Sequence, residues 1–167
     1  MRICLWHIPF LVCVLLHYSA AAQSMTEIKQ YGDSIYQTIK VLPDNEEKAF
    51  ALLDLSFFWG DYDTAQAFLY IDQAQKLLPK DKDQAFQLGV IDFYKASAYF
   101  DADSDKAKQL YMSAEKNLSK INNERATRYR IRLWSSYGAL LQREGRAREY
   151  VEALIHRVIP MATALRD

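Results

Sequence analysis

One pattern of small and apolar residues occurs twice in this chain, 40 residues apart, and it restricts the possible folds more than any other feature. The two copies are Ala67, Ile71, Ala74 and Leu78, and Ala107, Tyr111, Ala114 and Leu118. Spacings of three and four residues place each copy on one face of a helix. A recurrence of this length is typical of stacked helix pairs, because no single pair can bury its apolar face alone.

The stretch from residue 46 to residue 79 predicts one such pair. Glu46 to Trp59 is apolar nearly all round, so this helix must be covered on several sides. A break at residues 60–63 follows, and Asp63 with Gln66 resembles a capping box that starts the second helix. Strand-length alternation of apolar and polar residues is absent from the sequence. We therefore predict an all-α fold built from antiparallel helix pairs.

A helix is also expected before the first pair. Ser24 and Glu27 form another capping box, and apolar residues follow at helical spacing as far as Leu42. Pro43 should end this helix, since the residue before a proline disfavours helical geometry. Asp44 is then expected to start the next helix.

A third pair is expected near the end of the chain. Residues 122–123 should open it, Gly145 should turn it, and Pro160 should kink or weaken its second helix. A third copy of the recurring pattern is expected at Ala147, Val151 and Leu154, or four residues later at Val151, Ile155 and Val158.

At these positions the chain resembles the tetratricopeptide repeat (TPR) family. The second-helix spacing of the family is met by Ala67, Ile71, Ala74 and Pro79. The first-helix pattern is met three times, by Leu52, Leu55, Ser56 and Trp59, by Phe93, Ala96, Ser97 and Phe100, and by Trp134, Tyr137, Gly138 and Leu141. The resemblance implies a right-handed α-solenoid with repeats at about residues 44–79, 81–119 and 122–165. Residues 42–77 are similar, more narrowly, to the extracytoplasmic TPR segment of bacterial sensor histidine kinases and related regulators.

The resemblance also implies a concave groove lined by the first helix of each pair. The groove candidates are Phe50, Phe57, Tyr94, Arg132, Ser135, Gln142 and Arg143, with Leu53, Ile91, Ala98 and Ala139 beside them. Ordinary core packing is the alternative for the aromatic residues, and a solvated surface is the alternative for the arginines. If Arg132 and Arg143 share one helix face, they lie roughly 16 Å apart. At that distance they would be able to clamp an acidic peptide through bidentate carboxylate contacts.

Residues 1–22 have the composition of an export signal. Arg2 supplies a positive charge, residues 3–16 form an apolar run, and Ala20 and Ala22 occupy the small-residue positions of a cleavage site. The apolar run is shorter than the roughly 20 residues of a bilayer span. We therefore expect an exported, periplasmic or extracytoplasmic protein, with an uncleaved membrane anchor as the alternative.

The predicted mature domain, residues 23–167, has to be stable without disulfides. Both cysteines, Cys4 and Cys13, lie in the predicted leader. About 145 residues are enough for a sizeable core, because a chain of that size buries roughly 68–70% of its unfolded surface. We expect one helical domain.

Charge is unevenly distributed over that domain. Residues 23–118 hold 10 basic and 16 acidic residues, whereas residues 119–167 hold 10 basic and 5 acidic residues. A solvated surface is the simplest interpretation of Arg125, Arg128 and Arg132 on one helix face. The other interpretations are an anionic ligand and head-to-tail self-association. Nucleic acid is disfavoured as a partner, because export would separate the chain from it and the whole chain is not basic.

Catalytic and cofactor motifs are not recognisable in the sequence. The predicted domain holds one histidine, His156, and no glycine-rich phosphate loop. The acidic residues 101–105 lack the glycine and distal glutamate of a calcium loop and are expected to start a helix. We therefore expect no enzymatic activity, no cofactor and no metal.

The function predicted from these observations is that of a binding domain. Its expected ligand is a protein, a peptide or a small molecule in the groove, and the resemblance implies the sensing or interaction part of a bacterial signalling protein. A structural or assembly adaptor of the cell envelope is the alternative. A membrane is expected as a partner only if the leader is retained or a membrane span follows the given sequence.

Cleavage of the leader gives the first testable prediction. We expect the mature protein to begin at Gln23, because Ala20 and Ala22 follow the apolar run at the positions that signal peptidase reads. Intact-mass measurement or N-terminal sequencing of exported protein checks this. A protein that keeps Met1 and stays in the membrane fraction would contradict it.

Overall fold

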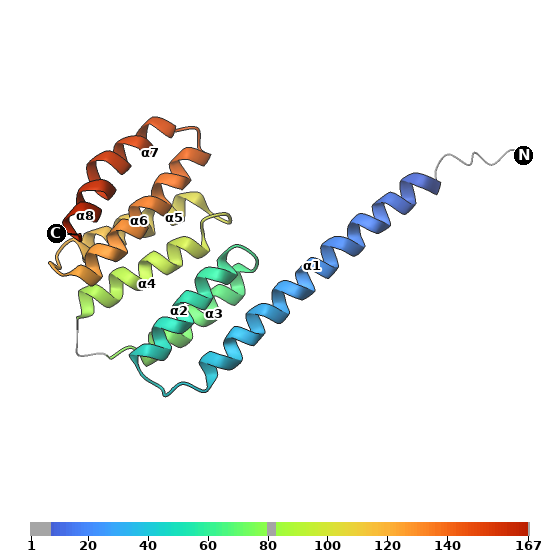
Figure 1. Cartoon of the computed structure of the whole chain (residues 1–167), viewed down its shortest axis with the longest axis horizontal. Coiled ribbons are helices and arrows are strands. Elements are labelled where there is room, and N and C mark those ends of the chain that lie inside the picture. The colour runs from blue at the N-terminus through green and yellow to red at the C-terminus, as the bar shows by residue number, and fades with distance from the viewer. Residues whose placement is uncertain (1–7, 80–82, 167) are drawn as a thin grey trace, which may run out of the picture. The chain divides into compact units, whose positions relative to one another are not determined.

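The computed structural model describes residues 8–79 and 83–166, and it describes side chains from Ser24 onward (Figure 1). The chain divides into two compact units, Met1–Lys40 and Val41–Asp167. The described residues form helices and no strand, so the predicted all-α class is confirmed. Among them, no helix combines the length and the apolar composition that a membrane span requires.

The first unit contains one long helix, α1 (Ile8–Lys40). The expected helix start at Ser24 is wrong, because Ser24 lies inside this helix rather than at its end. Neither proline nor glycine separates the apolar run from Ser24, and three good helix formers, Ala20–Ala22, bridge the two. The predicted leader spans residues 1–22. Positions 1–7 lie outside the described residues, and at positions 8–22 the backbone is described but the side chains are not. The leader therefore stays a prediction.

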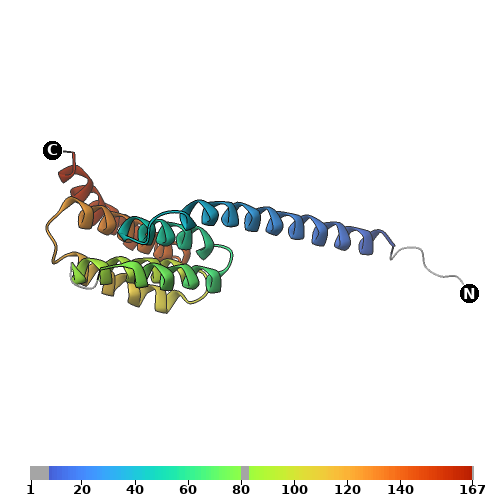
Figure 2. The same cartoon turned by 90° about the horizontal axis from the view of Figure 1, so that it is seen from below.

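The second unit consists of helices that run side by side in Figures 1 and 2. They are α2 (Glu46–Gly60), α3 (Thr64–Leu77), α4 (Gln84–Ala98), α5 (Ser104–Leu118), α6 (Glu124–Arg143), α7 (Ala147–Ala153) and α8 (Ile159–Ala164). Helices that are adjacent in sequence pair as α2–α3, α4–α5 and α6–α7. In addition, α4 contacts α2 and α3, and α6 contacts α4 and α5. The α2, α4 and α6 helices therefore form one continuous layer.

Side-chain caps fix where four of these helices begin. Asp63 accepts a hydrogen bond from the backbone N–H of Gln66, as the sequence predicted. Asp103 and Asn123 cap α5 and α6 in the same way. The expected cap at Asp44 is wrong, because Asn45 caps α2 while Asp44 pairs with Lys48 at 2.7 Å. Each such cap stabilises its helix by roughly 1 kcal/mol.

The recurring small residues lie at the helix contacts. Ala67, Ala74, Ala107 and Ala114 are fully buried, as are the larger residues between them, Ile71 and Tyr111. On the facing helix α4, Gly89 fits against α5 so closely that an added Cβ would lie 2.6 Å from Cγ of Leu118. The recurrence in the sequence thus marks the faces on which α3 and α5 pack.

Both registers expected for a third copy are wrong. Val151 and Ile155 are each 50% exposed, and Ala147 is exposed as well. The ring of Tyr150 packs instead against Gly138 of α6, where an added Cβ would lie 2.1 Å from the ring. Because Gly138 has no side chain, the large ring of Tyr150 fits against α6 at that point. Tyr150 and Ala153 therefore face α6, and Val151 and Ile155 face outward.

Pro160 interrupts the last helix, as the sequence predicted. A π-helical turn, Leu154–Val158, separates α7 from α8, and the N–H of Ile159 bonds to the carbonyl of Leu154. Pro160 has no N–H, and its ring would clash with the carbonyl four residues earlier in an α-helix. The wider π turn relieves that clash at a small local change in helix geometry.

Ala107→Arg tests this packing. Ala107 is fully buried between helices, so an arginine there would bury an unpaired charge and destabilise the domain by about 3–5 kcal/mol. Gln109→Arg, on the exposed side of the same helix, should change stability by less than about 0.5 kcal/mol. Urea unfolding of both variants measures the difference, and similar values would contradict the burial of this face.

Candidate functional site

The layer formed by α2, α4 and α6 carries a cluster of six aromatic rings. Phe50 and Phe57 come from α2, Phe86, Phe93 and Tyr94 from α4, and Tyr129 from α6. Tyr129 lies 5.7 Å from Phe86 and 6.0 Å from Phe93, measured between ring centroids. Phe57 lies 6.4 Å from Phe93 and 6.5 Å from Tyr94. Residues about 80 positions apart in the sequence therefore meet in one cluster, in which Phe86, Phe93 and Tyr94 are buried and Phe57 is exposed.

Arg132 lies at the centre of this cluster. Its guanidinium carbon lies 5.1–5.7 Å from the centroids of four rings, which belong to Phe57, Phe93, Tyr94 and Tyr129. A cation at such distances is attracted by the negative face of each ring. Its Nη1 lies 3.3 Å from the hydroxyl of Tyr94, and its Nη2 lies 3.8 Å from Oδ1 of Asp54. The rings and the carboxylate thus hold the guanidinium in place.

Tyr94 connects this arginine to the interior. The side chain is buried, and its hydroxyl donates a hydrogen bond to Asp54. Burial, then the neighbouring Tyr129 and the hydrogen bond to Asp54, raise the pKa of Tyr94 far above its ordinary value. The phenol therefore stays neutral at any physiological pH and acts as a fixed hydrogen-bond donor.

Other arginines of α6 pair with carboxylates of earlier helices. Arg125 pairs with Glu46 at 2.6 Å and lies 4.2 Å from the ring of Phe50. Arg130 makes a two-pronged contact with Glu115 of α5. The uneven charge of the sequence is therefore largely matched inside the domain, where basic α6 meets acidic side chains that come before it.

Arg143 has a similar place at the other end of α6. Its guanidinium pairs with Asp101 and with the backbone carbonyl of Phe100, and it lies 4.6 Å from the ring of Phe100. Both members of the predicted clamp, Arg132 and Arg143, thus already have carboxylate partners. An acidic peptide would have to compete with those partners, and the clamp stays a prediction.

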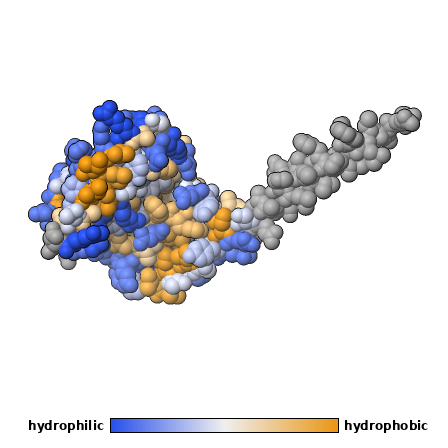
Figure 3. Space-filling model, turned by 45° about the horizontal axis from the view of Figure 1, so that its top comes forward, coloured by the Kyte–Doolittle hydropathy of each residue, from blue (hydrophilic) through white to orange (hydrophobic). Residues whose placement is uncertain are grey.

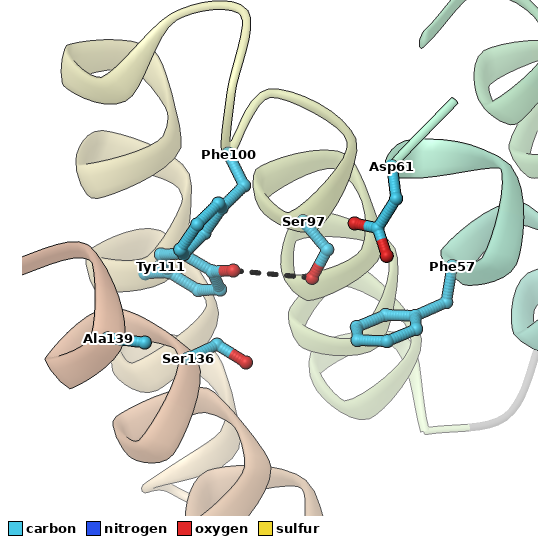
Figure 4. Close-up of a pocket in the computed structure, with 7 residues that line it drawn as sticks. All are labelled: Phe57, Asp61, Ser97, Phe100, Tyr111, Ser136 and Ala139. Atoms are coloured by element: carbon cyan, nitrogen blue, oxygen red, sulfur yellow. Dashed lines mark hydrogen bonds between the residues drawn. The ribbon is translucent and has the colours of Figure 1, made fainter. Parts of the chain in front are cut away.

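A hollow of about 190 Å³ is lined by residues of α2, α4, α5, α6 and the turns that follow α2 and α4, and Figure 4 shows it. We call it the Asp61 hollow; its lining residues are Phe57, Asp61, Ser97, Phe100, Tyr111, Ser136 and Ala139. Phe57 lies on one side in Figure 4, and Phe100 with Tyr111 on the other, while the carboxylate of Asp61 points between them. The hollow therefore has aromatic walls and one carboxylate.

The hydroxyls of the hollow are oriented by the chain itself. Ser97 donates a hydrogen bond to the carbonyl of Phe93 at 3.0 Å, and its Oγ lies 3.3 Å from the hydroxyl of Tyr111. A serine oxygen that donates its one proton to a carbonyl keeps its lone pairs for other donors. Burial raises the pKa of Tyr111, so this hydroxyl stays protonated. The Tyr111 hydroxyl is therefore the donor to Ser97 in this pair, and both oxygens keep lone pairs that can accept a hydrogen bond.

Asp61 differs from the other carboxylates of this surface. Among the described residues, no lysine or arginine pairs with it. Partial burial and, secondly, the neighbouring charge of Asp101 raise the pKa of Asp61 above its ordinary value. Asp61 also follows the C-terminus of α2, where the helix dipole disfavours a negative charge. This carboxylate is thus electrostatically unsatisfied within the chain.

A second, larger hollow lies between α6 and α8. Its volume is about 560 Å³, and its lining residues are Arg125, Arg128, Tyr129, Ile131, Arg132, Ala162, Leu165 and Arg166. The three arginines expected on one face of α6 thus line one hollow. Glu46, Glu124 and Asp54 pair with those three, which lowers the positive charge available to a ligand.

The predicted groove residues fall into three groups. Phe57 and Arg132 meet in the aromatic cluster, and Phe50 joins it through Tyr129 at 6.4 Å. Tyr94 belongs to the same cluster but is buried, so it follows the core-packing alternative rather than lying at the groove surface. Arg143 lies beyond Phe100, and Ser135 donates its hydroxyl to the carbonyl of Ile131. Gln142 is exposed and takes no part in the cluster.

Four residues placed beside the groove have mixed outcomes. Leu53, Ile91 and Ala98 are buried and belong to the core, so their placement at the groove surface is wrong. They face inward because a helix in the middle of a packed layer contacts neighbours on several sides. Ala139 does line the Asp61 hollow.

Three important residues were absent from the predicted groove set. Asp54 is the one charged residue between Lys48 and Trp59, and a lone carboxylate in an apolar helix was a usable signal. Tyr129 lies three residues before Arg132, which places both on one helix face. Asp61 gave no such signal, because an aspartate in a turn is ordinary.

Comparisons with known proteins add no family. No family model, curated protein or solved structure matches the chain. Within the described residues, no group of three or more histidine, cysteine or carboxylate side chains could hold a metal ion.

The raised pKa of Asp61 gives a testable prediction about stability. A carboxylate whose pKa is raised by folding destabilises the folded state when ionised, and this effect disappears as the pH falls through that pKa. Asp61→Asn should therefore raise the melting temperature at pH 7, and the gain should vanish near pH 3. Thermal unfolding at both pH values measures it. Asp72→Asn, on the exposed side of α3, is the control, and an equal effect in both variants would contradict the assignment.

Proposed function

We propose that this chain is a non-enzymatic binding module of the TPR type. In this proposal α2–α3, α4–α5 and α6–α7–α8 are three repeats of a right-handed stack, and the layer of α2, α4 and α6 receives a protein or peptide. The Asp61 hollow is the observation that carries it. An open hollow with aromatic walls and a few converging polar groups is the usual form of a ligand site.

The surface around the hollow supports binding. Phe57 is 41% exposed although it lies among other rings, and aromatic side chains of this kind provide contact area at low entropic cost. Arg132 lies near the ring of Phe57 and Arg143 near the ring of Phe100, two rings that line the hollow. Both arginine side chains are about 40% exposed and supply polar contacts next to the apolar ones. A peptide lying along α6 would meet both kinds of contact in turn.

The proposed cellular role is that of an extracytoplasmic sensing or interaction part of a bacterial signalling protein. It rests on the leader-like composition of residues 1–22 and on the resemblance of residues 42–77 to the extracytoplasmic segment of such proteins. The ligand would then be an exported protein, a peptide or a small molecule.

A structural adaptor is the second candidate, and one observation favours it. Figure 3 shows an apolar patch near the end of the chain, where Val151, Ile155 and Ile159 are each at least 50% exposed. The three residues are four positions apart and form a stripe along one side of the last helix. An exposed apolar stripe of this kind suits contact with another protein or with a second copy.

Fluorescence anisotropy with labelled acidic and basic peptide pools tests the proposed function. We expect saturable binding of at least one pool to the full-length chain, and a loss of at least tenfold in affinity for Phe57→Ala, because this ring is the exposed aromatic contact. Repeating the titration at two salt concentrations, with Arg132→Ala/Arg143→Ala, measures the contribution of the predicted clamp.

The stripe variant Val151→Ser/Ile155→Ser is the control for the adaptor. Unchanged peptide binding and unchanged sedimentation in this variant support the groove. Absence of binding by either pool, together with altered self-association of the stripe variant, would replace the binding module by the adaptor.

A further inference from the structure

Two turns of the domain, 40 residues apart, place an aspartate in the same position but give it different neighbours. Asp61 follows α2 before Asp63 caps α3, and Asp101 precedes Asp103, which caps α5. Asp101 receives the guanidinium of Arg143 from α6, which also covers the ring of Phe100. The chain itself thus shows what this position binds: a cation that lies against an aromatic ring.

Asp61 also lies beside aromatic rings, but no lysine or arginine of the described part of the chain pairs with it. The next helix in the layer, α4, ends at Ala98, whereas α6 extends to Arg143. At the end of α4 the hollow is lined by Ser97 and Phe100, which are neutral, and the charged neighbour of Asp61 in the following turn, Asp101, is itself acidic. Among the described residues Asp61 therefore has no basic partner of the kind that Asp101 has, and α4 ends before the position that would correspond, 40 residues earlier, to Arg143.

The lining of the Asp61 hollow matches a compact cation. Asp61 supplies a carboxylate, and the buried residues Ser97 and Tyr111 contribute hydroxyl oxygens to the lining of the same hollow. Phe57 and Phe100 provide ring surfaces on two sides, which attract a cation in a partly desolvated site. An ammonium group has three donors, and these acceptors approach from different directions.

We propose that the Asp61 hollow binds a primary ammonium group, carried by a lysine side chain or by a chain terminus of the peptide that the layer receives. The inference rests on the proposed binding function, since the ligand enters through the same surface. The hollow of about 190 Å³ has room for a four-carbon ammonium, given that one water occupies about 30 Å³ in the liquid.

Titration with butylamine tests the proposal. Butylamine is the cationic probe, butan-1-ol is the neutral probe of equal chain length, and butyrate is the anionic probe. In ¹⁵N-labelled full-length protein we expect butylamine to shift the amide signals of Gly60, Ser97 and Ala139 and to saturate. Butanol and butyrate should bind at least tenfold more weakly. Equal shifts by butylamine and butanol would overturn the proposal.

Two substitutions locate the effect. Asp61→Asn keeps the shape of the side chain and removes its charge, and it should weaken butylamine at least tenfold. Asp72→Asn removes a carboxylate from the exposed side of α3 and should leave the affinity unchanged. Phe57→Leu keeps an apolar wall without the ring and should weaken butylamine while sparing butanol. Unchanged affinity in Asp61→Asn would overturn the proposal.

Three peptides distinguish a lysine side chain from a chain terminus as the source of the ammonium group. They also test the ammonium site separately from the proposed peptide-binding function. One has a lysine and an acetylated N-terminus, one has acetyl-lysine instead, and one has norleucine with a free N-terminus. Binding of the first alone assigns the lysine side chain, and binding of the third alone assigns the terminus. If peptides bind through Phe57 but equally in all three forms, the ammonium site is wrong and the binding function stands. If butylamine binds and no peptide does, the ammonium site stands and the peptide-binding function fails.

Discussion

Close packing of helices through very small side chains is the constraint on which the rest of this domain depends. Four alanines on α3 and α5 are fully buried, and Gly89 of α4 lies so near Leu118 that a methyl group would not fit. At such distances a helix makes dispersion contacts along its whole length, which larger side chains would prevent. The α2, α4 and α6 helices can form a single layer only because α3 and α5 lie so close to it.

The arrangement of helices in this layer determines which charged side chains can form ion pairs. Arginines of α6 reach Glu46 on α2, Glu115 on α5 and Asp101 in the α4–α5 turn. The two exposed pairs, which involve Glu46 and Asp101, contribute little to stability individually, about 0–1 kcal/mol each, whereas the pair with Glu115 is half-buried. Their larger effect is on specificity, because they match the acidic first part of the domain to its basic last part. After this matching Asp61 remains without a basic partner among the described residues. The hollow that it lines therefore contains a carboxylate that no cation of these residues neutralises.

Local rules of helix formation account for most of what could be predicted. The helix over residues 46–59, the cap at Asp63, the interruption near Pro160 and the burial of Ala67 and Ala107 all follow from interactions within about four residues. Capping, proline geometry and the 3.6-residue period act at that range. The start of the first helix was mispredicted for the same reason. A capping box is only a possible start, and a chain that is already helical passes through it.

The features that local rules did not predict depend on contacts between residues far apart in the sequence. The sequence by itself determined that the domain is helical, where most helices begin and which faces of α3 and α5 are buried, since these depend on neighbours in the chain. Only the tertiary structure decided that Tyr150 packs on Gly138, which reversed the expected face of the last helix. It also decided that Arg143 pairs with Asp101, 42 residues away, while no basic side chain of the described residues pairs with Asp61. No local pattern encodes these outcomes, because they depend on the length of α4 relative to α6 and on the space between packed helices.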